Sequence, residues 1–384
     1  MIIHDSKHPK FEYFNEINEE AHGSGSLNVI KRVYVTSIEI GHQQLFLVFD
    51  TGSHFTWVQW ESCRLCLPSQ PPIIASYRVT RDFLFERCDR TLGNNCKYKE
   101  DTPNSVCELN VCMYQVKYKD QSGSLGFVST EVVTPFTNKT ISQRMVFGMG
   151  LDNKCFPEYS CFQGVAGFGA GPLAIPFQLT PRPTRWAFCL PLNQSMDGSF
   201  MVGDDAQILG EYKTAPLIDH KYYYLTILSE IFVIGKGKIP APNTTTILID
   251  TGATFSYLED SMFDDLVSML KEHVKETYDD SPVLGPYVED LDLELCYLKP
   301  HQIEITIVIG DAYLLLADPE KVWWKYTEYV YCLSFKRNGR APHSTLGNLH
   351  IRGYKVAYDL NPKQQSIQIS TGQEEAGCFT PIAV

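Results

Sequence analysis

Two aspartates in this chain are candidates for acid–base chemistry, because each one ends a short apolar run. Asp50 follows Leu47-Val48-Phe49, Asp250 follows Leu248-Ile249, and in both copies the next two residues are Thr and Gly. The apolar runs predict buried strands, and the glycines allow a tight turn after each aspartate. A charged side chain that leaves a buried strand needs a hydrogen-bonded partner or a chemical role. One Asp-Thr-Gly arises by chance in about one chain in ten of this length, but two with matching strands indicate two related halves with one carboxylate each.

The segments around these aspartates carry a resemblance to a known family. FDTGSHFTWVQ and IDTGATFSYLED resemble the two active-site signatures of pepsin-like aspartic proteases, and the resemblance extends from about Lys31 to Cys378. Its details favour the plant nepenthesin-like branch, on four stretches: CMYQVKYKDQSGSLGFVSTE, GVAGFGAGPLAIPFQL, YYYLTILSEIFVIGKGKI and STLGNLHIRGYKVAYDL. The resemblance implies an all-β dominated, bilobal pepsin-like aspartic protease fold with a few short helices. It also implies an aspartic endopeptidase, active at acid pH, with Asp50 and Asp250 as the catalytic pair.

Two carboxyl groups that share one proton can hydrolyse a peptide bond with water. The ionised group activates the water, and the protonated group supplies a proton to the carbonyl oxygen and then to the leaving nitrogen. Like charges in contact cannot both ionise cheaply, so the pair titrates as a unit, and the aspartic protease dyad is the standard example. We expect no metal and no cofactor, because the carboxyl pair needs neither and the sequence contains no His-Glu-x-x-His motif. The sequence also lacks the Gly-x-Ser-x-Gly motif of a serine nucleophile.

The resemblance gives supporting roles to the neighbours of the aspartates. These positions are Thr51, Gly52, Ser53, Thr251, Gly252, Ala253 and Thr254. The two threonines would tie the two loops together, and Ser53 would orient one carboxylate. Ala253 stands where many relatives have Ser or Thr and has no hydroxyl to donate. We therefore expect an unequal pair with a raised upper apparent pKa.

A hairpin is predicted to cover these residues. Alternation from Cys112 to Tyr118, a turn over residues 119–124 and a returning strand through Glu131 predict two paired strands. The hairpin resembles the flap of the family, with Tyr118 at the flap tyrosine position and Trp57 packed beneath it. Without the family, these would be a half-buried tyrosine on a surface hairpin and a core tryptophan. Lys119 and Gln121 replace the two flap glycines, so we expect the tip to change shape or to shift its turn to Gly123.

The remaining elements are expected to position the site. The stretches 165–171 and 346–348 resemble the segments that thread beneath each active-site loop, where glycine permits close approach of the backbone. Residues 261–276 predict a structural helix with Asp260 or Ser261 as its N-cap. Its expected buried face consists of Phe263, Leu266, Val267, Leu270 and Val274.

The cysteines predict an oxidising compartment. There are twelve, an even number, and six lie between Cys63 and Cys112 in a stretch with little periodicity that resembles the cysteine-rich insertion of the nepenthesin-like branch. A zinc site from Cys63-x2-Cys66 and Cys107-x4-Cys112 is the alternative, although no histidine lies between residues 55 and 219. The resemblance further implies the disulfide candidates Cys296 with Cys332 and Cys189 with Cys378.

Three Asn-x-Ser/Thr sites, at 138, 193 and 243, also favour secretion. We expect a place in the secretory pathway, extracellular or vacuolar, with the true N-terminus missing, because residues 1–5 do not resemble a signal peptide. A cytosolic protein with twelve thiols is the alternative.

Length and charge limit the organisation and the partners. A chain of 384 residues favours two domains, which we place at 31–205 with Asp50 and 206–384 with Asp250, after a leader or residual propeptide over 1–30. A net charge of −12 argues against nucleic acid and anionic membranes, and no apolar run is long enough to span a membrane. We expect a monomer that acts on polypeptide substrates. The alternative is a binding protein of the same fold, such as an inhibitor of polysaccharide-degrading enzymes, but such proteins tend to lose one Asp-Thr-Gly and both are present here.

Overall fold

Strands carry most of the regular structure, which confirms the all-β dominated fold class. The computed structural model describes residues 23–30, 33–67, 76–88, 95–135, 142–155, 162–179, 185–192, 198–203, 206–242, 245–283, 293–361, 363 and 365–372. In these ranges the helices are α1 (Ile175–Leu179), α2 (Asp260–Tyr278), α3 (Pro319–Val322) and α4 (Asn348–Ile351). None of the described helices is long and apolar enough to cross a membrane.

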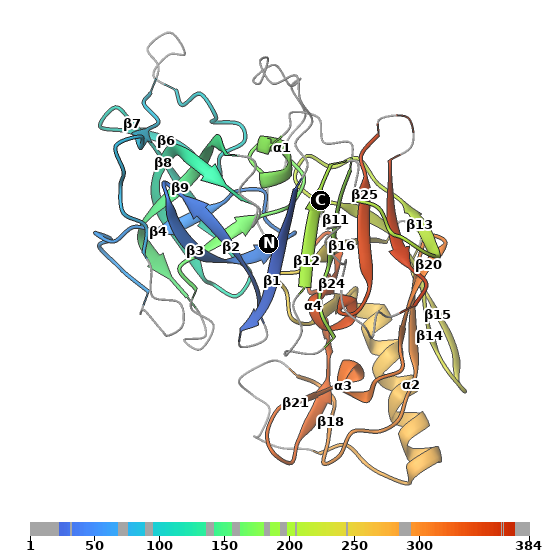
Figure 1. Cartoon of the computed structure of the whole chain (residues 1–384). Coiled ribbons are helices and arrows are strands. Elements are labelled where there is room, and N and C mark those ends of the chain that lie inside the picture. Colours follow the sequence, from blue (N-terminus) through green and yellow to red (C-terminus); the bar gives the residue numbers. More distant parts are fainter. Residues whose placement is uncertain are drawn as a thin grey trace.

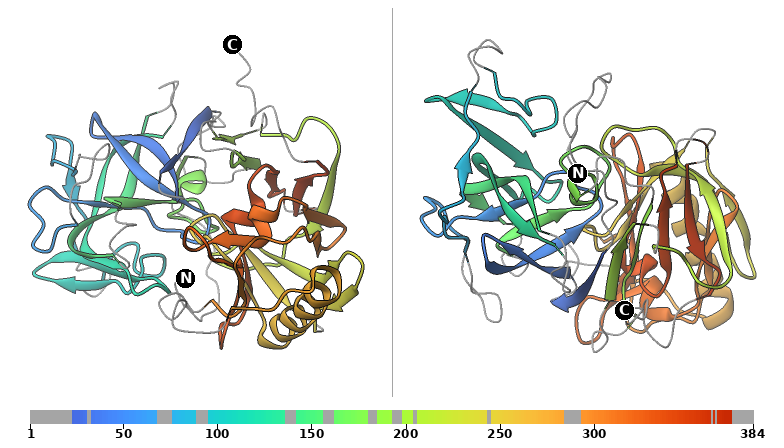
Figure 2. Two further views of the ribbon diagram at one scale, coloured as in Figure 1. Left: turned by 90° about the horizontal axis from the view of Figure 1, so that it is seen from below. Right: turned by 45° about the horizontal axis from the view of Figure 1, so that its top comes forward.

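The strands fall into two groups along the chain. Those of the N-terminal half are β1 (Gly23–Ile30), β2 (Val33–Ile40), β3 (Gln43–Asp50), β4 (Trp57–Gln59), β5 (Leu84–Phe85), β6 (Val106–Glu108), β7 (Val111–Lys117), β8 (Gly123–Thr134), β9 (Gln143–Lys154), β10 (Gly164–Gly167), β11 (Arg185–Cys189) and β12 (Gly198–Val202). Those of the C-terminal half are β13 (Tyr212–Pro216), β14 (Leu225–Val233), β15 (Gly237–Pro240), β16 (Thr246–Asp250), β17 (Ser256–Leu258), β18 (Cys296–Tyr297), β19 (Ile305–Ile309), β20 (Ala312–Leu316), β21 (Trp323–Lys325), β22 (Tyr331–Leu333), β23 (Phe335–Arg337), β24 (Ser344–Gly347), β25 (Lys355–Asp359) and β26 (Ser366–Ser370). In the views of Figures 1 and 2, the blue-to-green strands and the yellow-to-red strands gather on opposite sides.

One large sheet runs through both halves. Its order is β13-β26-β25-β11-β12-β1-β2-β3-β10-β4-β9-β8-β7-β6, with β5 attached to β8. Strand β25 of the second half pairs with β11 of the first, and Figure 1 shows β1, β12, β11 and β25 near one another in the middle of the molecule. The second half adds an eight-stranded sheet, β20-β19-β14-β16-β24-β17-β23 with β15 attached to β14, and a small sheet, β18-β22-β21. The strands that end in the two aspartates, β3 and β16, therefore belong to different sheets.

Strand β1 lies within the segment that we expected to be a leader. Residues 23–30 pair with β12 on one side and with β2 on the other, so this part of the segment belongs to the large sheet. The Gly-Ser-Gly-Ser composition hid the strand, because ladder hydrogen bonds come from the backbone and need no apolar pattern. Residues 1–22 lie outside the described part. The proposed domain boundary after residue 205 falls between β12 and β13, and the division into two domains stays a prediction.

An aromatic cluster supports the strand that ends in Asp50. Phe49 is fully buried, and its ring centroid lies 4.4 Å from that of Phe168 and 5.7 Å from that of Phe188. The cluster continues through Trp186 to Tyr358 of the second half, at 4.7 Å. Such rings bury large apolar areas and lock one another's orientation. The core thus fixes β3 relative to both halves.

The helix predicted over 261–276 is present as α2, on the outer side of the C-terminal half (Figures 1 and 2). All five residues of its expected apolar face are buried. The expected N-cap is wrong, because the helix begins at Asp260 and the carboxylate of Glu259 accepts hydrogen bonds from the backbone N–H groups of Ser261 and Met262. Glutamate is a less common N-cap than aspartate or serine, so the usual preference pointed one residue too late.

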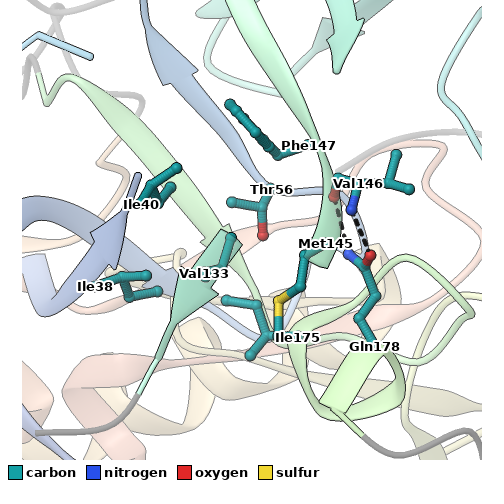
Figure 3. A pocket seen from close by; sticks show the side chains of 9 residues that line it. All are labelled: Ile38, Ile40, Thr56, Val133, Met145, Val146, Phe147, Ile175 and Gln178. Carbon is teal, nitrogen blue, oxygen red and sulfur yellow. Dashed lines mark hydrogen bonds between the residues drawn. The ribbon is translucent and has the colours of Figure 1, made fainter. Parts of the chain in front are cut away.

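Helix α1 is fixed to the N-terminal sheet by one glutamine. Gln178 accepts a hydrogen bond from the Val146 N–H at 2.7 Å and donates to the Val146 carbonyl at 2.9 Å, as the dashed lines in Figure 3 show. The apolar side chains around it, including Ile38 and Met145, leave a cavity of about 10 Å³. This cavity is about the size of one water molecule, so it is a packing gap and not a substrate site.

The described cysteines form disulfides. The cysteine-rich insertion is cross-linked by Cys63–Cys66, Cys88–Cys107 and Cys96–Cys112, and the second half by the expected pair Cys296–Cys332. The zinc alternative is therefore wrong, since its four sulfurs are already bonded. Cys189 is also disulfide-bonded, but Cys378 lies outside the described residues, so their pairing stays a prediction.

Candidate active site

The two aspartates end strands that occupy equivalent places in their sheets. Asp50, at the end of β3, lies opposite Gly167 of the parallel strand β10. Asp250, at the end of β16, lies opposite Gly347 of the parallel strand β24. A Cβ atom on Gly347 would lie 2.3 Å from the Phe255 carbonyl oxygen, so only glycine allows this strand to pass beneath the loop, as expected for the stretch 346–348.

The two loops are tied to each other by their threonines. The Thr51 N–H donates to Oγ1 of Thr251 at 3.0 Å, and the Thr251 N–H donates to Oγ1 of Thr51 at 3.0 Å. Each hydroxyl then donates onward to the opposite strand, to the carbonyls of Ile249 and Phe49, at 2.8 Å in both cases. Both threonines are fully buried, so these four bonds fix the distance between the loops without competition from water.

Each carboxylate rests against the glycine of the opposite loop. A Cβ atom on Gly52 would lie 2.6 Å from Oδ1 of Asp250, and one on Gly252 would lie 2.6 Å from Oδ1 of Asp50. Any side chain at either glycine would push the opposite carboxylate away. The glycines therefore serve the contact between the carboxylates as well as the turn. Asp50 and Asp250 are only 7% and 8% exposed.

Hydrogen bonds to the two carboxylates are unequal, as the alanine at 253 predicts. Oδ1 of Asp50 accepts from the Gly52 N–H at 2.7 Å, and Oδ2 accepts from the Ser53 hydroxyl at 2.5 Å. Asp250 accepts at Oδ1 only from backbone N–H groups, those of Gly252 at 2.9 Å and Ala253 at 3.2 Å. Among the described contacts, no side-chain hydroxyl reaches Oδ2 of Asp250.

This environment raises the pKa of Asp250. Burial raises the pKa of Asp250 to about 7, and the negative charge of Asp50 adds to the shift. A hydrogen bond between the two carboxyl groups also favours the protonated form of Asp250. One proton is therefore held between the carboxyl groups at acid pH, on the Asp250 side. The arrangement can present a base and an acid to the same bound molecule.

The hairpin of β7 and β8 brings Tyr118 and Trp57 together beside Asp50. The Trp57 indole N–H donates to the Tyr118 hydroxyl at 2.8 Å. Burial, together with the charge of Asp50, raises the pKa of Tyr118 above its usual range, so its hydroxyl keeps its proton. Tyr118 also hydrogen-bonds with Ser53. Because Ser53 donates to Asp50, a chain of donors runs from Trp57 through Tyr118 and Ser53 to the carboxylate.

The hairpin tip keeps its left-handed residue. Gln121 has φ of 68°, its N–H donates to the Tyr118 carbonyl at 3.1 Å, and the Tyr118 N–H donates to the Ser122 carbonyl at 2.9 Å. Of the two alternatives expected for the tip, a changed shape or a turn shifted to Gly123, the shift is wrong, since Gly123 has no positive φ. Gly123 is needed instead because a Cβ atom there would lie 2.4 Å from the Val116 carbonyl oxygen.

Several contacts around the site were not found from the sequence. Asn348 donates from Nδ2 to the Thr251 carbonyl at 3.1 Å and so holds the second loop from below. The Lys119 ammonium at the hairpin tip lies 3.8 Å from the ring centroid of Tyr257, in the C-terminal half. The sequence placed the stretch 346–348 beneath the second loop, but it did not show that the Asn348 side chain bonds to that loop. For the contact of Lys119 with Tyr257, the sequence offered one indication, which was a lysine at the position of a flap glycine.

Comparisons with known proteins show the family and the fold of this chain. The family described as "Xylanase inhibitor N-terminal" matches residues 34–204, and "Xylanase inhibitor C-terminal" matches residues 223–368. The aspartic proteinase nepenthesin-2 of Nepenthes gracilis is 25% identical over 349 residues, covering 85% of this chain and 75% of the relative. A protein of Arabidopsis thaliana named "Probable aspartic protease" is 28% identical over 371 residues, with 87% and 79% covered. In fold, the chain is similar to conglutin gamma, a basic 7S globulin from lupine seeds, with a TM-score of 0.69, 16% identity, and 92% and 96% of the two chains covered.

Proposed function

The chain belongs to the pepsin-like aspartic protease family, in its plant nepenthesin-like branch, and we propose that it is an acid endopeptidase that uses the pair Asp50 and Asp250. The observation that carries this proposal is the intact pair of loops. Both carboxylates are present, each lies against the opposite glycine, and the threonine bonds hold the loops in register. Relatives named as aspartic proteases support the same activity.

The proposed mechanism assigns different protons to the two carboxyl groups. A water molecule between them donates a proton to the ionised Asp50 carboxylate as its oxygen attacks the peptide carbonyl carbon. Asp250 gives its proton to the carbonyl oxygen, which forms a neutral diol. Asp50 then protonates the leaving nitrogen while a diol hydroxyl returns its proton to Asp250, so that the C–N bond breaks and the starting state is restored. Buried donors that are already in place, Gly52 and Ser53, stabilise the Asp50 charge without reorganisation.

A second candidate is a binding protein of the same fold without proteolysis. The matched families are described as xylanase inhibitor, and the similar solved structure is a seed globulin. The hairpin tip also rests on the C-terminal half through Lys119 and Tyr257, where relatives have a glycine. Such a protein would bind a polysaccharide-degrading enzyme and leave peptide bonds intact.

We also propose a monomer that passes through the secretory pathway. The four described disulfides and the bonded Cys189 support an oxidising compartment. The excess of acidic residues supports solubility. Size-exclusion chromatography with light scattering tests the monomer.

The decisive experiment is cleavage of acid-denatured globin at about pH 4, where the carboxyl pair holds one proton. We expect pepstatin-sensitive cleavage by the refolded wild-type chain. Asp250→Asn is the matched control, because the amide keeps the shape of the side chain and removes the shared proton. Cleavage above a few percent of wild type in folded Asp250→Asn would contradict the assignment of the pair. A folded wild-type chain that cleaves nothing but binds a xylanase would support the second candidate.

A further inference from the structure

Two lysines from opposite halves of the molecule meet over one aromatic surface beside Asp250. Lys119, at the tip of the β7–β8 hairpin, has its ammonium 3.8 Å from the ring centroid of Tyr257. Lys336, in β23, has its ammonium 5.2 Å from the ring centroid of Phe255. Because β17 and β23 pair with Tyr257 opposite Lys336, the second lysine lies next to the ring that carries the first.

The Tyr257 ring faces the hairpin and not the core. Ser256 and Leu258 are fully buried, whereas Tyr257 between them is half-buried, so the strand turns alternate residues to opposite sides. Phe255 lies on the same side as Tyr257, and its ring packs edge-on to Trp324 with centroids 5.0 Å apart. Phe255, Tyr257 and Trp324 therefore form one aromatic surface beneath the two ammonium groups.

The two ammonium groups on this surface lie close enough to interact with each other. Burial lowers the pKa of Lys119, the charge of Lys336 lowers it further, and Asp250 and Asp260 oppose the shift. The two ammonium groups thus repel each other at acid pH, where both are charged. The next residue of β23, Arg337, is not part of this group, because it forms ion pairs with Asp264 and Glu294.

The distance from the catalytic pair fits a substrate side chain near the bond that is cleaved. Strands β16, β24 and β17 are neighbours, so Tyr257 lies two strand spacings from the Asp250 strand, about 10 Å. An extended substrate advances about 3.3 Å per residue. A side chain one or two residues from the scissile bond would reach the lysines.

We propose that Lys119 and Lys336 form a specificity subsite, on the Phe255 and Tyr257 surface, that accepts an acidic side chain of the substrate close to the scissile bond. This inference rests on the proposed peptidase function of the same site. A carboxylate between the ammonium groups removes their repulsion and replaces the weaker contact of Lys119 with the Tyr257 ring. It also links Lys119 of the hairpin tip to Lys336 of the C-terminal half, so the acidic residue strengthens the contact that the tip already makes with Tyr257.

The test uses peptide pairs that differ only in Glu or Gln, placed in turn at each position near the scissile bond. At about pH 5.5 glutamate is mostly ionised, and we expect one position at which Glu raises kcat/KM over Gln by about fivefold, the size of a partly shielded ion pair. At about pH 3.5, where glutamate is mostly protonated, the preference should fall toward one. Lys119→Met and Lys336→Met keep the apolar stem and remove the charge, and each should lower the Glu/Gln ratio. Lys119→Arg keeps the positive charge and should keep the wild-type Glu/Gln ratio.

Lys117→Met is the matched control, because this exposed lysine lies on the same hairpin outside the proposed subsite. It should keep the wild-type ratio. A Glu/Gln ratio of kcat/KM near one at every position in the wild type, or a ratio unchanged in both methionine variants, would overturn the subsite. Cleavage of the peptides would still support the proposed peptidase function in that case. Binding of uncleavable reduced-amide Glu and Gln peptides gives the same ratio without catalysis. Glu-selective binding without cleavage would therefore contradict the peptidase and keep the subsite, and equal or absent binding would contradict the subsite.

Discussion

Introduction of a hydroxyl at position 253 should move the alkaline limit of activity toward acid. In the first loop, the Ser53 hydroxyl lies 2.5 Å from Oδ2 of Asp50, whereas Asp250 receives only backbone donors, the nearer at 2.9 Å. Ala253 is half-buried and occupies the equivalent place, so Ala253→Ser or Ala253→Thr can supply the missing donor. The ionised form of Asp250 is then stabilised, and its raised pKa falls.

The size of the shift follows from the strength of one hydrogen bond. A bond to a charged group contributes about 1.5 kcal/mol after the cost of ordering the hydroxyl, and 1.36 kcal/mol corresponds to one pKa unit. Burial and the Asp50 charge raise the pKa of Asp250 to about 7. The alkaline limb of the kcat/KM profile should therefore move by about one unit, which lowers kcat/KM at about pH 7 by roughly fivefold.

The assay is the pH profile of kcat/KM with a fluorogenic peptide, for the wild type and for Ala253→Ser, Ala253→Thr and Ala253→Val. Valine is the matched control, because it has the shape of threonine without the hydroxyl. We expect the limb to move in the serine and threonine variants and to stay in the valine variant. The reasoning is refuted if folded, active serine and threonine variants keep the wild-type limb or move it to higher pH, or if valine causes the same shift as threonine.

Three further predictions concern stability. Thr51→Val removes two buried hydrogen bonds between the loops and should lower the free energy of unfolding by about 2–4 kcal/mol in urea titrations. The double variant with Thr251→Val should lose much less than the sum of the two single losses, because both residues belong to one network. Additive losses would contradict the shared network. Gln121→Gly removes the strain of a left-handed residue but raises the conformational entropy of the unfolded chain, and these two effects on stability oppose each other. The substitution should therefore change KM more than stability. A large drop in Tm with unchanged kinetics would show that the tip is structural. Burial lowers the pKa of Lys321 to about 7. Below pH 7 the buried ammonium therefore destabilises the folded chain in full, and this destabilisation disappears as the pH rises toward the usual pKa of lysine. Lys321→Met should therefore stabilise the protein by about 2 kcal/mol in acid, after subtraction of the lost hydrogen bond to the Arg352 carbonyl. This gain in stability should fade at alkaline pH. A gain that does not depend on pH would show that the charge of Lys321 is not its cause.

The sequence was sufficient where residue type and local order determine the outcome. The repeated Asp-Thr-Gly after apolar runs predicted two strands that end in aspartates, and β3 and β16 do so. The 3.6-residue period predicted the buried face of α2, because only helical spacing places those residues on one side. The alanine at 253 predicted an unequal pair, since a methyl group cannot donate a hydrogen bond in any fold.

Other features depended on residues that are distant in the sequence. Strand β1 forms because β12 and β2 offer backbone partners on both sides, and no side-chain pattern announces this. The sequence alone could not decide which residues form the turn at the hairpin tip. Gly123 is required by its close approach to the Val116 carbonyl and not by a positive φ, and the sequence does not show this contact.

What the sequence by itself determined is the chemistry that is available: two carboxylates on matching turns, with a serine three residues after Asp50 and an alanine three residues after Asp250. Only the tertiary structure decided how these groups act on one another. The threonine bonds that join residues 200 apart, the burial that raises the pKa of Asp250, and the contact of Lys119 with Tyr257 across the two halves all depend on distances between segments far apart in the chain. Hydrogen bonds and desolvation act over a few ångströms in space, and the order of residues along the chain does not fix those distances.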